Sequence, residues 1–455
     1  MIVTSLRRLM IVATVVPLMT FESHALSFAE AYEAARVHDA QYRAAGHDLD
    51  ASRQSVPVAR SALMPSVALS MSGADVSGSR AFPNAVNQEV RVRVDYSTPQ
   101  ANLALRVPVF NHEARSRLSQ AEAQADMAES VFRSRGLELI DRLAVGYLQV
   151  LLADEAKRLA DVQVQALTSQ LAQAQQRLQR GEGTRVDVAQ TQAALDVSRV
   201  RVVEADDQLD LTRRQLRRIT GLPTPPSRQV PGDYMPAPLP PEGLHQWLSL
   251  AVSQSPTLQA RQQALTAARM GVSRQYAGHL PRLDLVASLS RSQNESLSNL
   301  NQTSVLRSIG MQLNVPLYSG GGVEASVKQA MAEQARAEED VRAEREALEV
   351  EVQRHYQAVA SGPSRITAYS RAVESAELAL QGARRALEAG VGTNNDVSET
   401  LARRFSAARD LAQARIDYLT SRLRLMLQAG MPMSEVATDI DRALTVVTGS
   451  TPPMK

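Results

Sequence analysis

Residues 315–321 read Val315-Pro316-Leu317-Tyr318-Ser319-Gly320-Gly321, and residues 107–111 read Val107-Pro108-Val109-Phe110-Asn111. Each motif ends a segment of alternating apolar and polar residues and precedes a long segment rich in Ala, Leu, Gln, Glu and Arg. Alternation indicates a half-buried strand, whereas the second composition is typical of long helices and coiled coils. The motif therefore marks a strand-to-helix transition that the chain contains twice.

The rest of the chain repeats with the same order, at an offset of about 209 residues. The turn Gly183-Thr184 is matched by Gly392-Thr393. Residues 221–243 hold eight of the 21 prolines and are expected to form an extended linker between the halves. We therefore divide the chain into a signal peptide (1–25), a first repeat (26–220), a proline-rich linker (221–243), a second repeat (244–430) and a C-terminal tail (431–455).

Each repeat is predicted to contain a helix, two strands, a very long helix, a glycine-containing turn and a shorter helix. The expected helices are 27–60, 112–180 and 186–219, then 244–276, 323–389 and 395–428. Apolar residues at alternating steps of four and three predict coiled-coil seams, for example Tyr369, Val373, Ala376, Leu380, Ala383 and Leu387. Such long helices reach about 100 Å, too long for a compact globular domain. Gly362-Pro363 should kink or break the second one.

The predicted strands are 90–96 and 103–109 in the first half and 283–289 and 309–317 in the second. Each has an apolar face and a small or polar face, a pattern found both in ordinary half-buried sheets and in membrane strands. No nearby amphipathic segment could cover the apolar face, which favours the membrane. Because about eight strands is the observed minimum for a closed barrel, four strands per chain would require an oligomer; three chains would give twelve.

The N-terminus predicts export. Arg7 and Arg8 precede an apolar segment, and Ser23-His24-Ala25 is a small-x-small cleavage signal, so we expect a signal peptide with the mature chain starting at Leu26. The alternative of a membrane anchor is less favoured, since the apolar segment is too short to span a bilayer.

The composition excludes several classes of protein. With no cysteine, the chain has no disulfide, thiolate zinc site or iron–sulfur cluster, and a net charge of +2 gives no reason to expect nucleic acid as a partner. The seven histidines are scattered, and no catalytic or metal-binding motif is present. We therefore expect no enzyme activity, cofactor or metal.

In its two strand-to-helix motifs, its paired Gly-Thr turns and its closing Ala414-Arg415-Ile416-Asp417-Tyr418-Leu419, the chain resembles the TolC family of outer-membrane channel-tunnels. The resemblance covers essentially the whole mature sequence. It implies a mainly α-helical homotrimer: a twelve-stranded β-barrel in outer-membrane lipid, continued by a coiled-coil tunnel across the periplasm. The linker and the chain ends would form an equatorial belt.

The resemblance further implies the outer-membrane exit duct of a type I secretion system. Its partners would be an inner-membrane ABC transporter, a periplasmic adaptor (membrane fusion) protein and a secreted protein, such as an adenylate cyclase-haemolysin type toxin. One alternative in the same fold is the outer component of a small-molecule efflux pump. The absence of a cysteine for lipid attachment favours secretion. An alternative from another class is a soluble periplasmic coiled-coil adaptor.

Acidic residues follow both Gly-Thr turns. By their position at helix starts, Asp187, Asp396 and Glu399 would cap free backbone amides. The resemblance adds a second role, because the family's turns form the periplasmic tip: Asp396 and Glu399 would form acidic rings at the pore constriction, and Asp187 and Arg185 would help to hold the tip closed. The chain departs from the family pattern in a shorter spacing before Asp396 and in Asn394 where a turn arginine is usual.

Overall fold

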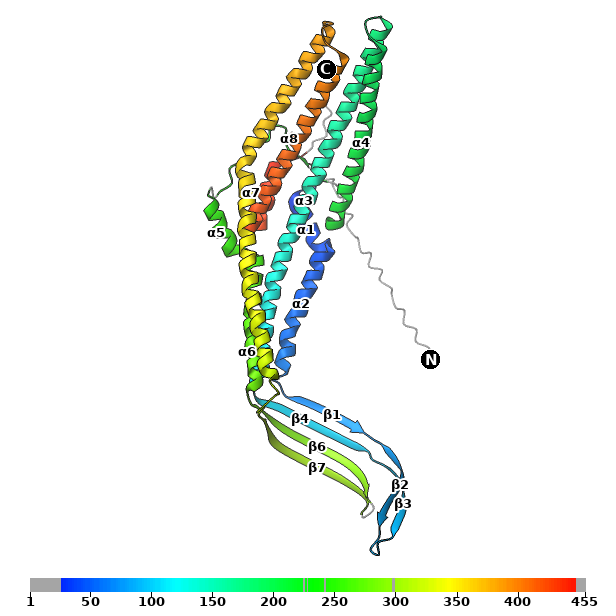
Figure 1. The fold of residues 1–455 in the computed structure, drawn as a ribbon, viewed down its shortest axis with the longest axis vertical. Coiled ribbons are helices and arrows are strands. Elements are labelled where there is room, and N and C mark those ends of the chain that lie inside the picture. Colours follow the sequence, from blue (N-terminus) through cyan, green and yellow to red (C-terminus); the bar gives the residue numbers. More distant parts are fainter. Residues whose placement is uncertain (1–25, 224–225, 227, 241–242, 297–298, 447–455) are drawn as a thin grey trace, which may run out of the picture.

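A long bundle of helices carries a twisted sheet at one end (Figure 1). The computed structural model describes residues 26–223, 226, 228–240, 243–296 and 299–446. The expected signal peptide (1–25) lies outside the described residues, as do short parts of the linker and the end of the tail.

The helices follow the expected duplication. The first half contains α1 (Phe28–His38), α2 (Ala40–Ser61), α3 (His112–Gln179) and α4 (Arg185–Thr220). The second contains α5 (Leu244–Gln254), α6 (Pro256–Tyr276), a 3-10 turn η1 (Ala277–His279), α7 (Gly322–Glu388) and α8 (Asn394–Gln428). The tail adds α9 (Met433–Ala443). The long helices, with 68 residues in α3 and 67 in α7, are confirmed.

The first expected helix of each half is interrupted once. Asp39 separates α1 from α2 with φ −61° and ψ 117°, and Ser255 separates α5 from α6 with φ −61° and ψ 116°. Each residue leaves the helical region and caps the following helix, accepting a hydrogen bond from the backbone N–H of Tyr42 or Leu258. The two breaks are therefore the same feature, duplicated.

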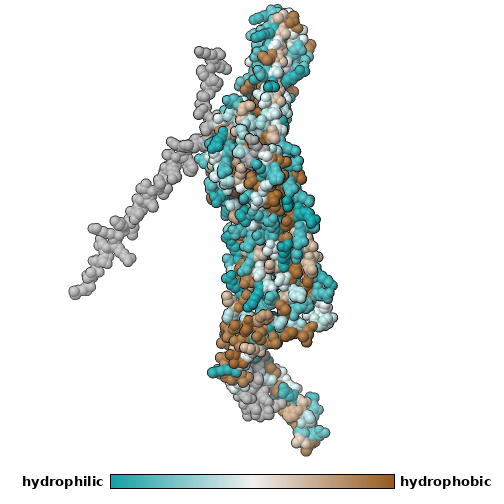
Figure 2. Space-filling model, turned by 90° about the vertical axis from the view of Figure 1, so that its left-hand side faces the viewer, coloured by the Kyte–Doolittle hydropathy of each residue, from teal (hydrophilic) through white to brown (hydrophobic). Residues whose placement is uncertain are grey.

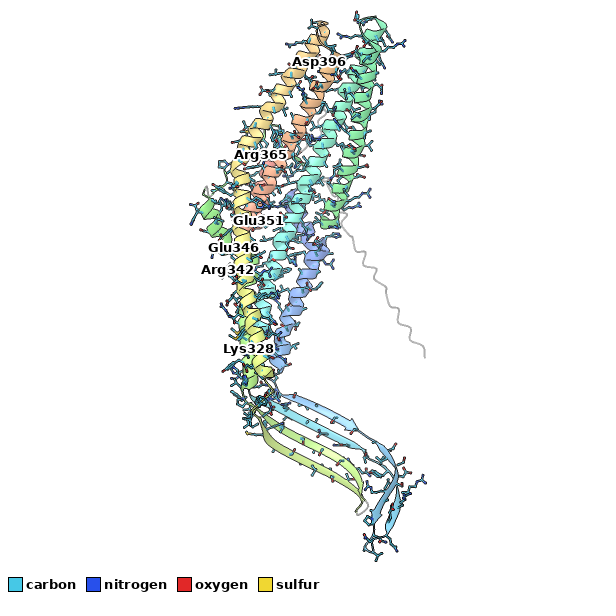
Figure 3. The ribbon with its side chains drawn as sticks, in the orientation of Figure 1. Lys328, Arg342, Glu346, Glu351, Arg365 and Asp396 are labelled. Atoms are coloured by element: carbon cyan, nitrogen blue, oxygen red, sulfur yellow. The ribbon has the colours of Figure 1, made fainter. Side chains whose placement is uncertain are left out.

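Of the expected kink or break at Gly362-Pro363, the structure has the kink and not the break, because α7 continues through Pro363 as one helix. Its axis changes direction near Arg365 (Figure 3), so the proline is accommodated as a bend. Position 362 must be glycine for a separate reason, which is the close packing of Tyr418. A Cβ at this position would lie 2.2 Å from Cδ2 of Tyr418, so only glycine lets α8 pack this ring against α7.

The strands differ from the prediction in the first half. There the chain forms β1 (Ser66–Ser72), β2 (Asp75–Pro83), β3 (Glu89–Ser97) and β4 (Gln100–Asn111); in the second half it forms β6 (Arg282–Ser296) and β7 (Asn299–Asn314). In the described residues an antiparallel four-stranded sheet has the order β1-β4-β6-β7, and β2 pairs only with β3. The predicted strand 90–96 therefore lies outside this sheet, and β1 takes its place there.

The sheet has an apolar face and a polar face. The apolar face is made by Val67, Leu69, Met71, Leu103, Leu105, Val107, Leu283, Leu285, Ala287, Leu289, Ile309, Met311 and Leu313, which the strand register brings together. Its far end carries Arg291 and Arg307. The polar face carries Ser288 and Ser308, whose hydroxyls are 2.7 Å apart. In Figure 2 hydrophobic surface gathers where the helices meet the sheet, below a mostly hydrophilic helical body.

The main core lies at mid-height of the bundle, where α1, α5 and α9 pack on α3, α7 and α8. Trp247 and Tyr147 are fully buried there, and the Tyr147 hydroxyl donates to the carbonyl of Leu26 at 2.7 Å. The linker and tail meet at this level, where β5 (Arg228–Gln229) pairs with β8 (Thr445–Val446). Among the helices that the structure describes, none is long and apolar enough to cross a membrane.

Candidate pore constriction

The end of the bundle away from the sheet is formed by two turns of the same design, α3–α4 and α7–α8 (Figure 1). Gly181 and Gly390 end the long helices with φ 77° and 74°, values that glycine adopts without strain. The next N–H, of Glu182 or Val391, donates to the carbonyl five residues back, 2.9 and 3.0 Å away. A close-packed second glycine and a threonine cap follow in both turns.

The two aspartates close capping boxes. The Asp187 carboxylate accepts from the N–H and the hydroxyl of Thr184 at 3.0 and 2.7 Å. The Asp396 carboxylate accepts from the Thr393 N–H at 2.9 Å, and the Asp396 N–H donates to the Thr393 hydroxyl at 3.1 Å. The hydrogen bonds that the Asp396 carboxylate accepts from Thr393 hold its pKa below its usual range. Capping is therefore a role that both residues perform within one chain.

The other two expected gate residues are exposed. Glu399 lies one turn after Asp396 and pairs with Arg403 on the same helix. Arg185 starts α4 with its side chain in solvent. Among the described residues, no hydrogen bond or ion pair joins the pair 185 and 187 to the pair 396 and 399, so the structure places them on separate turns.

The two turns are joined by hydrogen bonds from two side chains of α3 that the sequence analysis did not identify. Gln170 of α3 is buried, and its Nε2 donates to the carbonyl of Asn394 at 3.1 Å and to the hydroxyl of Ser398 at 3.0 Å. Arg177 of α3 donates to the carbonyl of Leu387 at the end of α7, 2.8 Å away. These three bonds link the α3–α4 coil to the α7–α8 coil close to the turns.

These contacts had a partial signal in the sequence. Gln163, Leu167, Gln170 and Ala174 follow the four-three-four spacing of a buried seam, and all are buried. A glutamine at a seam position must find a hydrogen-bond partner. Below the turns an apolar cluster crosses between the coils, made by Leu167, Leu195, Leu380, Val397, Leu401 and Phe405.

An open groove of about 630 Å³ runs between α3, α4 and α8 beside this cluster. Charged side chains of both signs line it, namely Arg201, Glu204, Glu399, Arg403 and Arg409. Glu399 therefore lines a groove of mixed charge within its own chain, in addition to lying close to the α7–α8 turn.

A second polar network ties the linker and the tail to α8 at mid-height. Arg422 makes a bidentate pair with Asp439 of α9 at 2.7 Å for both bonds, and it donates to the carbonyl of Ala237 at 2.7 Å and to the Tyr418 hydroxyl at 3.1 Å. Burial acts to lower the pKa of Arg422, but the bonds and charge of Asp439 outweigh it and hold that pKa above its usual value. One side chain thus joins α8, α9 and the linker.

The sequence matches a model of the outer membrane efflux protein family at residues 31–222 and 247–431. It is similar to the proteases secretion protein PrtF of Dickeya chrysanthemi, with 32% identity over 93% of this chain and 92% of that protein. Similarity to the alkaline protease secretion protein AprF of Pseudomonas aeruginosa is also 32%, over 96% of this chain and 90% of AprF. Protein CyaE of Bordetella pertussis is 30% identical over 69% of this chain and 65% of CyaE.

The fold is that of solved outer-membrane channels. A structure of CusC, described as showing conformational changes accompanying folding and transmembrane channel formation, superposes with a TM-score of 0.77 at 17% identity, over 89% of this chain and 92% of CusC. The CmeC outer membrane channel of Campylobacter jejuni gives 0.76 at 16% identity, over 91% of this chain and 89% of CmeC. Both likenesses extend over the helices and the sheet together.

Proposed function

This chain belongs to the outer membrane efflux protein family, and we propose that it is the outer-membrane exit duct of a type I secretion system that exports a protein. The observation that carries this proposal is the similarity to two protease secretion proteins over more than nine-tenths of the chain. A secreted protease is favoured as the cargo over the toxin expected from the sequence, since PrtF and AprF match more of the chain than CyaE does. Membership of an outer-membrane family decides against the soluble coiled-coil adaptor.

The duct is a homotrimer. Among the described residues, β1 and β7 each have one edge without a partner strand, and an unpaired strand edge is not tolerated in lipid. Three copies of the sheet described above supply twelve strands, so that β7 of one chain pairs with β1 of the next. The apolar face then contacts lipid and the polar face lines a water-filled lumen.

The helical body supports the same closure. Contacts run from α7 to α8, from α8 to α3 and from α3 to α4, which leaves α4 and α7 as the two flanks (Figure 1). On α4 a buried seam faces α3, whereas Val197, Val200 and Val203 are 54%, 57% and 60% exposed. Leu378 of α7 is 63% exposed on the opposite flank, at the height where Leu195 and Leu380 share a cluster. Burial of these side chains between neighbouring protomers would stabilise the trimer.

Gating takes place at the turns. Three copies of Asp396 and Glu399 form acidic rings that favour cations over anions, and Asp187 and Arg185 line the neighbouring turns. Gln170 and Arg177 hold the coils together in this conformation, so opening requires their hydrogen bonds to break. The adaptor binds the turn end and the ABC transporter supplies the energy, since the duct itself performs no chemistry.

The test is export. The gene is deleted in its own host with all other genes left intact, and the medium is assayed for secreted protein and the cells for drug susceptibility. Loss of one or more proteins from the medium, restored by the intact gene, is the expected result. Normal secretion with increased drug susceptibility would instead assign the chain to small-molecule efflux.

A further inference from the structure

The β2–β3 hairpin continues the β1–β4 pair beyond the sheet without a change of register. Ser72 pairs with Gln100 at the end of β1–β4, and Asp75 pairs with Ser97 at the start of β2–β3. Between them the Thr98 N–H donates to the carbonyl of Ala74 at 2.8 Å. Because each strand contributes two residues to this junction, the alternation of side chains between the two faces carries across it.

The apolar stripe changes face at this junction. In β1 and β4 the odd-numbered residues are apolar and belong to the apolar face of the sheet. In β2 and β3 the large apolar residues are even-numbered: Val76, Phe82, Val90, Val92, Val94 and Tyr96. The odd-numbered residues are polar or charged except for Ala81 and Pro83 near the hairpin end of β2, and they include Asp75, Glu89, Arg91, Arg93 and Asp95. Within residues 75–83 and 89–97, the even face carries a single charge, Arg80.

The position of the two apolar stripes on opposite faces determines which face of the hairpin points toward the channel axis in the trimer. The apolar face of the sheet points to lipid, so the odd face of the hairpin points away from the channel axis and the even face points toward it. A hairpin bent outward over the membrane would lay its charged face on lipid and its apolar face in water. An upright or inward-bent hairpin leaves its charged face in water and turns its apolar face toward the other hairpins at the channel axis, and only this orientation is consistent with the hydrophobic effect.

We propose that the apolar even faces of three β2–β3 hairpins pack on one another over the outer mouth of the channel and close it as a cap. The proposal rests on the trimeric duct proposed above, and the occupant of each apolar face is the same hairpin in the other two protomers. Val76 and Phe82 remain 37% exposed and Val90 36% exposed in a single chain, which leaves apolar area for this contact.

The hairpin is long enough to reach the axis. Residues 89–99 extend about 36 Å at 3.3 Å per residue. A twelve-stranded barrel has a backbone radius of about 12 Å, from a strand spacing of about 4.8 Å and a tilt of about 40°. Arg80 can pack its apolar stem in the contact while its guanidinium reaches water.

Cysteine cross-linking tests the cap, since the natural chain contains no cysteine to interfere. Val92→Cys is expected to form disulfide-linked dimers between protomers when whole cells are oxidised. Arg93→Cys, at the same height on the odd face, is the matched control and is expected to remain monomeric on a denaturing gel. Equal cross-linking of the two, or none of Val92→Cys, would overturn the cap.

A second pair of cysteines separates this outcome from failure of the trimer. The double variant Val200→Cys with Leu378→Cys should cross-link across the proposed α4–α7 seam whether or not the cap exists. If it cross-links and Val92→Cys does not, the cap alone is wrong; if neither links and the protein is monomeric, the proposed duct fails.

Access to the lumen gives an independent readout. Ser288→Cys places a thiol on the polar face of the sheet, and a polymer-coupled maleimide added outside the cells should label it slowly. The added changes Val92→Asp and Val94→Asp charge the even face and should speed this labelling, whereas Arg91→Asp and Arg93→Asp on the odd face should not. Equal labelling rates in all backgrounds would show an open mouth and refute the proposal.

Discussion

Replacing Gln170 by methionine should loosen the closed turns of the channel. Methionine keeps the length of the side chain but removes the amide that donates to Asn394 and Ser398. A buried hydrogen bond contributes about 0.5–1.5 kcal/mol, so the two bonds together contribute about 1–3 kcal/mol in each protomer. If the three protomers open together, the closed state loses about 3–9 kcal/mol relative to the open one.

Single-channel recordings in planar bilayers measure this effect. In a Val92→Asp, Val94→Asp background, in which the proposed outer cap cannot close, Gln170→Met should show longer or more frequent high-conductance openings than that background alone, and cells carrying it should become more sensitive to antibiotics that are normally too large to enter. Gln173→Met, on the exposed side of α3 nearly one turn later, is the matched control. Equal conductance and equal antibiotic sensitivity in the two variants would refute a holding role for the Gln170 bonds.

Further predictions concern packing, charge and the mid-height network. Gly362→Ala should destabilise the protein by about 1–3 kcal/mol through the clash with Tyr418. Gly382→Ala on the same helix, where a Cβ meets no described atom within 4 Å, should stabilise it by about 0.5–1 kcal/mol. Melting temperatures that shift in the same direction in the two variants would contradict this prediction. Asp396→Asn should keep the cap but reduce cation selectivity, read as a smaller reversal potential. Because the pKa of the folded-state Asp396 is lowered, its contributions to selectivity and capping should persist at neutral pH and disappear only as the pH falls below the usual carboxyl range; loss near neutral pH would point to other groups. Arg422→Met should lower the free energy of unfolding by about 3–5 kcal/mol, because it leaves the Asp439 carboxylate without its partner. Limited proteolysis should then cut the chain near α9. An unchanged digestion pattern would show that the network is not needed to hold α9 against the bundle.

The features predictable from the sequence were those set by local contacts. The long helices end within two residues of their predicted positions, since Thr184 and Thr393 cap the following helices and Gly181 and Gly390 end the preceding ones. The breaks at Asp39 and Ser255 also have local causes, since Ser255-Pro256 is a helix-start signal in the sequence.

The features that the sequence did not disclose depend on distant partners. The alternation that predicted a strand at 90–96 is also present at 66–72, where no strand was predicted, and only pairing with β4 decides which one joins the sheet. The sequence does contain a signal for this choice. The apolar residues are odd-numbered in β1 and β4 but even-numbered in β2 and β3, and apolar residues on opposite faces of one continuous hairpin cannot both contact lipid. The bond from Gln170 joins residues 224 positions apart, so its position on a seam could be recognised but its partner could not.

The two halves of the chain agree closely at one end of the molecule and differ at the other. The turns α3–α4 and α7–α8 share their glycines, caps and hydrogen bonds, whereas the paired strands of the first half extend to Pro83 and Glu89 and those of the second stop at Ser296 and Asn299. In the proposed trimer the periplasmic end is therefore nearly six-fold symmetric and the outer end strictly three-fold. A periplasmic partner meets six almost equivalent docking positions around the rim, while anything approaching from outside the cell meets three tall hairpins alternating with three short ones.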